Sequence, residues 1–277
     1  MKAIVKAKPE VGGLEFRELP IPQPGPHDVL IKVKCAAICG TDLHIYKWDP
    51  WSQGRLNLPR IIGHEFAGEI VEIGRAVEHF KIGDYVSGEG HLVCGFCQMC
   101  RTHQSHICEN WVGLGYDVDG AFAEYIVLPE ANVWVNDPDM KPEIAACQDP
   151  LGNAVHAVFA ADCVGKKVVV FGCGPVGILA VAVLKAIGAA QIIAIEWDNE
   201  YRRDLAIKAG ATHTLMSKNI DDVPQAIRDI TGHKGADVTI ELAGTKRAIQ
   251  DAVSGVDRKS TSLKSSHLIR TRMPSSA

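Results

Sequence analysis

The pattern of hydrophobic and polar positions divides the 277-residue chain into two parts. The first part contains short apolar, β-branched segments separated by turns rich in glycine and proline, which is typical of an antiparallel β domain. These segments predict strands at residues 3–5, 29–33, 67–73, 84–87 and 123–127. We therefore expect a β-rich first domain.

From about Asn153 the pattern changes to helices and strands in alternation. Along this part of the chain, segments with apolar residues at helical spacing alternate with continuous apolar runs. They predict helices at 154–161, 176–187 and 200–209, and strands at 167–171, 191–196, 212–216 and 237–242. Because strands that alternate with helices form parallel sheets, we predict an α/β fold class, with a β-rich domain at 1–153 and a parallel-sheet domain at 154–256.

Charge and composition limit which binding partners and which cellular compartment we expect. A net charge of −4 without a basic stripe does not favour nucleic acid or an anionic membrane surface as a partner. The N-terminus has no signal-peptide pattern, and the longest apolar run, 176–184, is too short to span a bilayer. Nine cysteines without an export signal point to metal ligands and free thiols, so we expect a cytoplasmic protein.

A glycine-rich turn, Gly172-Cys-Gly-Pro-Val-Gly177, links the predicted strand at 167–171 to the next helix. In a dinucleotide-binding turn, Gly172 permits the tight bend, Gly174 lets the backbone approach a pyrophosphate, and Gly177 lets the helix pack on the strand. An acidic residue, Glu196, ends the following strand about twenty residues later. This context predicts a dinucleotide site; the alternative is a structural turn that holds no ligand.

Glu196 also bears on which dinucleotide binds. Its carboxylate can accept hydrogen bonds from both ribose hydroxyls and would repel a 2′-phosphate, which favours NAD over NADP. Arg202 and Arg203 keep NADP open, because a nearby arginine can accommodate that phosphate. The residues predicted to bind the cofactor are Gly172, Gly174, Val176, Gly177, Glu196 and Arg202.

Four cysteines lie at intervals of three, three and eight residues in one short stretch. Four thiolates at this spacing can surround one tetrahedral Zn²⁺, and a site with no open position is structural. The predicted ligands are Cys94, Cys97, Cys100 and Cys108. The alternatives are reduced core cysteines or a zinc ribbon for nucleic acid, but the flanking residues are not basic enough for the ribbon. Nearby, we expect His91, His103 and His106 to be solvated.

A second metal site is suggested by residues that lie further apart in the sequence. Cys39 follows an apolar strand, and His64 and Glu65 stand at the start of another apolar segment. A thiolate, an imidazole and a carboxylate are a ligand set for catalytic zinc that leaves one position open. Spacing alone does not establish that they meet, so the alternative is that each is an ordinary core residue.

Together these motifs resemble the zinc-dependent medium-chain alcohol dehydrogenase family. The resemblance covers residues 1 to about 256, and it rests on CGTDLH at 39–44 with the following YKWDPW, GHE at 63–65, the cysteine group, QDPLGNAVH at 148–156 and GCGPVG at 172–177. It implies a GroES-like β-rich catalytic domain followed by a Rossmann NAD-binding domain. It also implies two zinc ions per chain, one catalytic and one structural.

The resemblance further implies roles for the polar residues around the catalytic zinc. Thr41 would accept the proton of the substrate hydroxyl, and His44 would pass that proton to solvent. Asp42 would orient the ring of His64 by a hydrogen bond. Asp149 occupies the position near the zinc where relatives carry a carboxylate that can exchange with the bound water.

The stretch around Trp48 and Trp51 resembles the branch of the family that oxidises the secondary hydroxyl of L-threonine to 2-amino-3-oxobutanoate. The alternatives are a polyol or vicinal-diol dehydrogenase, of sorbitol or butanediol type, and a zinc-free reductase or binding protein of the same fold. The two tryptophans could line a substrate pocket or act as packing residues. For the intact protein the resemblance implies a homotetramer.

The last segment, 257–277, departs from the family pattern. It is rich in Ser, Thr, Lys and Arg and shows no strand pattern, so we expect a disordered, non-native tail on a truncated reading frame. The predicted strand at 237–242 would then lie at the edge of its sheet. Such a chain would be poorly soluble or inactive and would not assemble, which leaves an inactive fragment as a further alternative.

Overall fold

The computed structural model describes residues 1–264, with side chains through residue 257. The chain divides into two compact units, Met1–Asp149 and a second unit that begins at Pro150. Helix α5 (Gln148–Phe159) begins in the first unit and continues into the second. Among the helices of residues 1–264, none is long and apolar enough to cross a membrane.

The first unit is built from antiparallel sheets, as predicted. Its strands are β1 (Lys2–Lys6), β2 (Leu14–Glu18), β3 (Asp28–Ala37), β4 (Arg60–Ile61), β5 (Glu65–Ile73), β6 (Tyr85–Gly88), β7 (His91–Leu92), β8 (Val112–Gly113), β9 (Tyr125–Pro129) and β10 (Val133–Val135). They form a five-stranded sheet in the order β10-β6-β5-β3-β9, a three-stranded sheet β2-β1-β4 and the pair β7-β8. Buried apolar side chains of the large sheet, such as Ile31, Phe66 and Ile70, make its core.

Short helices join these strands and carry much of the unit's polar chemistry. They are α1 (Gly40–Lys47), α2 (Pro50–Arg55), α3 (Gln98–Arg101) and α4 (Pro142–Ala145), with single turns η1 (Ser105–Ile107) and η2 (Glu130–Asn132). Helix α1 follows directly from the end of β3, so the residues of its first turn lie at the end of the large sheet.

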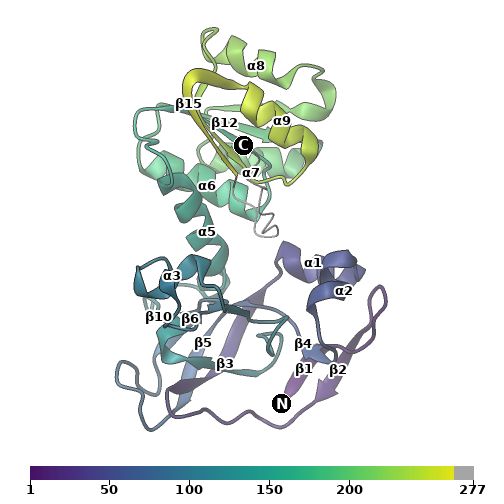
Figure 1. Ribbon diagram of the computed structural model, residues 1–277, viewed down its shortest axis with the longest axis vertical. Coiled ribbons are helices and arrows are strands. Elements are labelled where there is room, and N and C mark those ends of the chain that lie inside the picture. The colour runs from purple at the N-terminus through teal and green to yellow at the C-terminus, as the bar shows by residue number, and fades with distance from the viewer. Residues whose placement is uncertain (265–277) are drawn as a thin grey trace. The chain divides into compact units, whose positions relative to one another are not determined.

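The second unit is a parallel sheet with helices on both faces (Figure 1). The strands β11 (Lys167–Phe171), β12 (Gln191–Glu196), β13 (His213–Met216), β14 (Ala236–Glu241) and β15 (Val256–Lys264) follow the order β13-β12-β11-β14-β15. The helices are α6 (Pro175–Ala186), α7 (Glu200–Ala209), α8 (Val223–Ile230) and α9 (Lys246–Ser254), with the turn η3 (Ser217–Asn219). The predicted α/β architecture is therefore confirmed.

Alternate residues of the central strand β11 face two separate cores. Val168 and Val170 pack with α5, α6 and α7, whereas Val169 and Phe171 pack with α8 and α9. A strand that is buried on both faces needs apolar side chains at every position, which explains why this segment reads as a continuous apolar run.

The expectation for strand β14 was wrong. It is not an edge strand, because β15 pairs with it in parallel from Ala236↔Val256 to Glu241↔Lys264. The backbone of residues 257–264 is therefore extended strand, where a disordered tail was expected. The rest of that predicted tail, 265–277, lies outside the described residues.

Candidate metal centres and dinucleotide site

Cys39 is held at the point where β3 gives way to α1. It is the N-cap residue of α1, with extended backbone angles, and its backbone N–H donates to Asp42 Oδ2 at 2.9 Å. A carboxylate in this position satisfies one of the unpaired amides at a helix start. Thr41 Oγ1 lies 3.7 Å from the Cys39 sulfur and is buried in the same turn.

Strand pairing brings the other two candidate ligands to Cys39. Strands β3 and β5 are antiparallel neighbours in which Ala37 faces Glu65, two residues before Cys39. Gly63 turns the chain into β5 with φ 88°, and Phe122 fills the space that a side chain would need there. As a result, one donor atom each from Cys39, His64 and Glu65 lies within 4.8 Å of the others.

The electrostatics of this cluster fit a bound cation. His64 and Glu65 are 7% and 5% exposed. Burial and the Glu65 carboxylate raise the pKa of Cys39 to about 12, and burial raises the pKa of Glu65. A bound zinc ion would lower both pKa values, because it stabilises the thiolate and the carboxylate. The thiolate, imidazole and carboxylate donors match the set that Zn²⁺ accepts in open catalytic sites.

Asp42 acts first as the capping carboxylate of α1. It is 4% exposed, and burial raises its pKa to about 6 although the backbone N–H of Cys39 donates to it. This contact fixes the start of the helix beside Cys39. The further role of Asp42 in orienting the His64 ring stays a prediction.

Asp149 lies in a second acidic group beside His64. Donor atoms of Asp149, Glu89 and His91 lie within 4.8 Å of one another. A Cβ atom placed on Gly90 would lie 3.7 Å from Asp149 Oδ1 and 3.5 Å from His64 Cβ, so this group adjoins the predicted zinc ligands. Burial, with Glu89 and Glu65, raises the pKa of Asp149 to about 7.

His91 is partly exposed, and it also has partners in the protein that the sequence did not predict. Its Nδ1 lies 2.8 Å from Glu89 Oε1, and its ring lies 5.1 Å from that of Trp111. The hydrogen bond to Glu89 raises the pKa of His91. Sequence reasoning missed Glu89 and His91 because neither belongs to a recognised ligand spacing.

The two residues of the predicted proton relay stand one turn apart on α1. Thr41 is buried, whereas the side chain of His44 is 37% exposed. Residues three apart on a helix share a face, so the pair leads from the buried turn at Cys39 toward solvent. His44 Nδ1 is hydrogen-bonded to Asp49, a residue that the sequence did not single out.

Aromatic residues surround this face of the site. Trp48 and Trp51 both pack against a cluster that contains Ile45 and Tyr116. Tyr116 lies edge-on to Trp51, with 5.6 Å between ring centroids, and edge-on to His64 at 6.3 Å. The tryptophans thus pack in the cluster of Tyr116, and it is Tyr116 that lies against the ring of His64. Tyr116 was missed, because a lone tyrosine in a glycine-containing loop has no distinguishing pattern.

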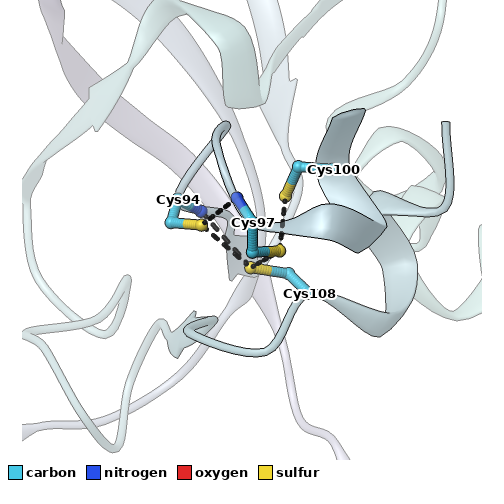
Figure 2. Close-up of side chains that lie close together, drawn as sticks. All are labelled: Cys94, Cys97, Cys100 and Cys108. Carbon is cyan, nitrogen blue, oxygen red and sulfur yellow. Dashed lines mark hydrogen bonds between the residues drawn. The ribbon is translucent and has the colours of Figure 1, made fainter. Parts of the chain in front are cut away.

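The four-cysteine group forms a compact lobe around α3 and η1 (Figure 2). Sulfur–sulfur distances are 3.5 Å for Cys97–Cys100, 3.8 Å for Cys97–Cys108 and 3.6 Å for Cys94–Cys108. In a tetrahedron with zinc–sulfur bonds of 2.3 Å, the thiolates lie about 3.8 Å apart. The sulfurs therefore converge at the separation that one bound Zn²⁺ requires.

Backbone amides support the thiolate form at one side of the lobe. Cys97 N–H donates to the Cys94 sulfur at 3.4 Å, and Cys94 N–H donates to the Cys108 sulfur at 3.4 Å. Amide donors, including that of Phe96, lower the pKa of Cys94 to about 6. Desolvation and the neighbouring thiols raise the pKa of Cys100 to about 12, so a cation is needed for all four to ionise together.

The glycine-rich turn has the geometry that its sequence predicts. Gly172 has φ 92°, and a Cβ there would lie 2.9 Å from the backbone of Ala243. At Gly177 a Cβ would lie 1.9 Å from the carbonyl oxygen of Gly172, so only glycine allows this packing of α6 on β11. Gly174 has open space instead, which leaves the N-terminus of α6 accessible to a phosphate.

Glu196 ends β12 against this turn. Its carboxylate accepts hydrogen bonds from the backbone N–H groups of Cys173 at 3.2 Å and Trp197 at 2.9 Å. Arg202 stands in the first turn of α7, where Asn199 caps its backbone N–H. Arg203 is paired with Asp204 at 2.8 Å.

Two family models match the chain. The one described as alcohol dehydrogenase GroES-like domain matches residues 25–138, and the one described as zinc-binding dehydrogenase matches residues 175–263. The second match extends into β15, which agrees with the strand seen there.

Individual proteins give the same picture. The chain is 51% identical over 253 residues to L-threonine 3-dehydrogenase of Caldanaerobacter subterraneus subsp. tengcongensis, a match that covers 91% of this chain and 72% of that protein. A zinc-binding dehydrogenase of Sinorhizobium meliloti bound to NADP has a TM-score of 0.89 at 30% identity, with coverage of 98% and 78%. For 2R,3R-butanediol dehydrogenase of Bacillus subtilis the TM-score is 0.81 at 30% identity, with coverage of 97% and 79%.

Proposed function

Since the chain belongs to the zinc-dependent alcohol dehydrogenase family, we propose that it oxidises the secondary hydroxyl of L-threonine to 2-amino-3-oxobutanoate with NAD as hydride acceptor. The observation that carries the proposal is the convergence of Cys39, His64 and Glu65 beside the Thr41–His44 face of α1. This arrangement combines an open metal site with a route for a proton.

The chain's own residues would divide the work of alcohol oxidation. Zinc held by Cys39, His64 and Glu65 would act as a Lewis acid on the substrate hydroxyl. Thr41, which is buried beside Cys39, would accept the hydroxyl proton and pass on its own. The half-exposed ring of His44 would carry that proton to water.

A second zinc in the cysteine lobe would have a structural role. All four positions of that ion would be filled by Cys94, Cys97, Cys100 and Cys108, which leaves no site for a substrate. The proposal therefore requires two zinc ions per chain. We also propose a cytoplasmic location, where such thiols stay reduced, and a homotetramer as the assembly of the intact protein.

NAD is the cofactor we favour over NADP. The carboxylate of Glu196 lies against the glycine turn, where it would accept hydrogen bonds from the adenosine ribose and repel a 2′-phosphate. The predicted contacts of the pyrophosphate are Gly174, Val176 and Gly177 at the start of α6, and Arg202 would lie nearby.

L-threonine is favoured over a vicinal diol by the level of similarity. Identity to the Caldanaerobacter L-threonine 3-dehydrogenase is 51%, against 30% to the Bacillus 2R,3R-butanediol dehydrogenase.

Initial rates of NADH formation test the proposal. We expect kcat/KM for L-threonine to exceed that for 2,3-butanediol and sorbitol by at least about a hundredfold, because a site built for polar groups rejects analogues that lack them. A preference for either diol would overturn the substrate. NADH formation that survives the loss of the Cys39 thiol in Cys39→Ala would overturn the mechanism.

A further inference from the structure

The turn between α1 and α2 brings an acidic side chain back onto α1. Trp48 ends α1 with φ 53° and ψ 47°, in the left-handed region that a residue with a side chain adopts only at a cost. The turn is held by contacts of the Trp48 ring, which packs in the aromatic cluster and lies 5.2 Å from Lys6 Nζ. The next residue, Asp49, begins α2 as its N-cap.

Both carboxylate oxygens of Asp49 are engaged. Oδ1 accepts hydrogen bonds from the backbone N–H of Ser52 at 3.1 Å and from its hydroxyl at 3.2 Å. Oδ2 is hydrogen-bonded to His44 Nδ1. Ser52 is fully buried, so its two hydrogen bonds hold the Asp49 carboxylate in place, and this carboxylate in turn binds His44.

The ring of His44 is thereby held from two sides. Asp49 binds Nδ1, and the ring of Trp51 lies edge-on at 6.2 Å between centroids. Burial raises the pKa of Asp49, but hydrogen bonds from His44 and Ser52 outweigh it and hold this pKa below its usual range. The carboxylate is therefore ionised at neutral pH and accepts a hydrogen bond from His44 Nδ1, which must carry a proton.

We propose that Asp49 is a positioning residue of the proton relay, which fixes His44 with Nδ1 protonated and leaves Nε2 to exchange protons. The inference rests on the proposed function. In the relay, Thr41 Oγ1 would gain the substrate's hydroxyl proton and release its own toward solvent, and His44 Nε2 would accept a proton along that route. The imidazolium that forms is stabilised by Asp49, and its Nε2 proton leaves to water, so no net charge accumulates.

The test compares two aspartate N-caps, of which Asp49 is hydrogen-bonded to a histidine. Asp49→Asn keeps a side chain suited to the N-cap of α2 but removes the charge at His44. Asp222→Asn makes the same change at the N-cap of α8, where Asp222 accepts a hydrogen bond from Gln225 N–H at 2.8 Å. We expect kcat for L-threonine to fall about tenfold to a hundredfold in Asp49→Asn with unchanged KM, and to stay within about twofold in Asp222→Asn.

A further readout, rescue by buffer, separates positioning from a general loss of structure. Raising the concentration of a buffer that does not bind zinc, such as HEPES, should restore part of the lost kcat in Asp49→Asn and leave wild type unchanged. If Asp49→Asn keeps wild-type kcat, or if KM rises while kcat is retained, the proposal is wrong.

A measurement without turnover keeps this inference distinct from the proposed function. Nitrogen-15 chemical shifts of His44, assigned with His44→Gln, report which ring nitrogen carries the proton. We expect Nδ1–H in wild type and loss of that preference in Asp49→Asn, whether or not L-threonine is the substrate. A neutral Nε2–H ring in wild type would overturn the role of Asp49.

Discussion

At the scale of single residues, Glu196 is the group on which we propose that cofactor selectivity depends. It is 6% exposed, and backbone amides of Cys173 and Trp197 hold its carboxylate at the end of β12. A fixed negative charge at this point favours a ribose with free hydroxyls and disfavours a phosphorylated one. Arg202 and Arg203 follow in α7, so on this proposal the preference for NAD depends on the carboxylate of Glu196, and not an arginine, facing the ribose.

Removing that charge should relax the selectivity. In Glu196→Ala we expect the ratio of kcat/KM for NAD to that for NADP to fall by at least about tenfold, which corresponds to about 1.4 kcal/mol. The matched control is Asp198→Ala, because Asp198 is exposed and paired with Lys218 at 3.2 Å. A ratio that changes equally in both variants would contradict the assignment of Glu196.

Residue types with a distinctive spacing could be predicted from the sequence, and those without one could not. The spacing of the four cysteines predicted their lobe, whereas Cys39, His64 and Glu65 are brought together by the pairing of β3 with β5, which their spacing does not show. Asp49 and Tyr116 carry no such pattern. Their places beside His44 and His64 arise from a left-handed turn at Trp48 and from aromatic packing, which depend on the tertiary structure.

At the scale of elements, the predictions succeeded where burial or capping residues mark the segment. Strand β11 is almost entirely buried, and helix α7 begins after the capping residue Asn199 and ends at Gly210, so both have the predicted bounds. Helices α8 and α9 were missed because each contains only eight or nine residues, too few for their apolar stripes to repeat over several turns. Strand β15 was missed because its polar sequence pairs through backbone with β14.

The N-terminal loop supports α1 through a buried lysine. Lys6 on β1 is fully buried, and its Nζ donates to the carbonyl oxygens of Glu10 at 2.5 Å and Gly12 at 2.7 Å. Gly12 N–H in turn donates to the carbonyl oxygen of Tyr46 in the last turn of α1. The loop and the helix that bears His44 are therefore joined through one ammonium group.

Replacing this lysine should loosen the helix end. In Lys6→Met we expect the free energy of unfolding to fall by about 2–4 kcal/mol, because two charge-assisted hydrogen bonds to carbonyls are lost. The control is Lys8→Met, since Lys8 is exposed and its pair with Glu15 at 3.6 Å contributes less than about 1 kcal/mol. Urea unfolding followed by tryptophan fluorescence measures both, and equal stabilities of the two variants would contradict the role of Lys6.

At the scale of the whole molecule, the chemistry is divided between two units with separate cores. The candidate zinc ligands belong to the unit Met1–Asp149, and the glycine-rich turn belongs to the unit that begins at Pro150. The matched relative from Caldanaerobacter is longer, since the match covers 72% of its length. Because both groups of candidate zinc ligands lie in Met1–Asp149, we expect this unit to bind all the zinc of the chain.

The zinc content of the purified chain tests the central claim most directly. Metal analysis should find about two zinc ions per chain in wild type and about one in Cys39→Ala, which loses the catalytic site and keeps the cysteine lobe. The same variant should lose NADH formation from L-threonine. A wild-type chain that oxidises L-threonine with one zinc ion or none would contradict the account.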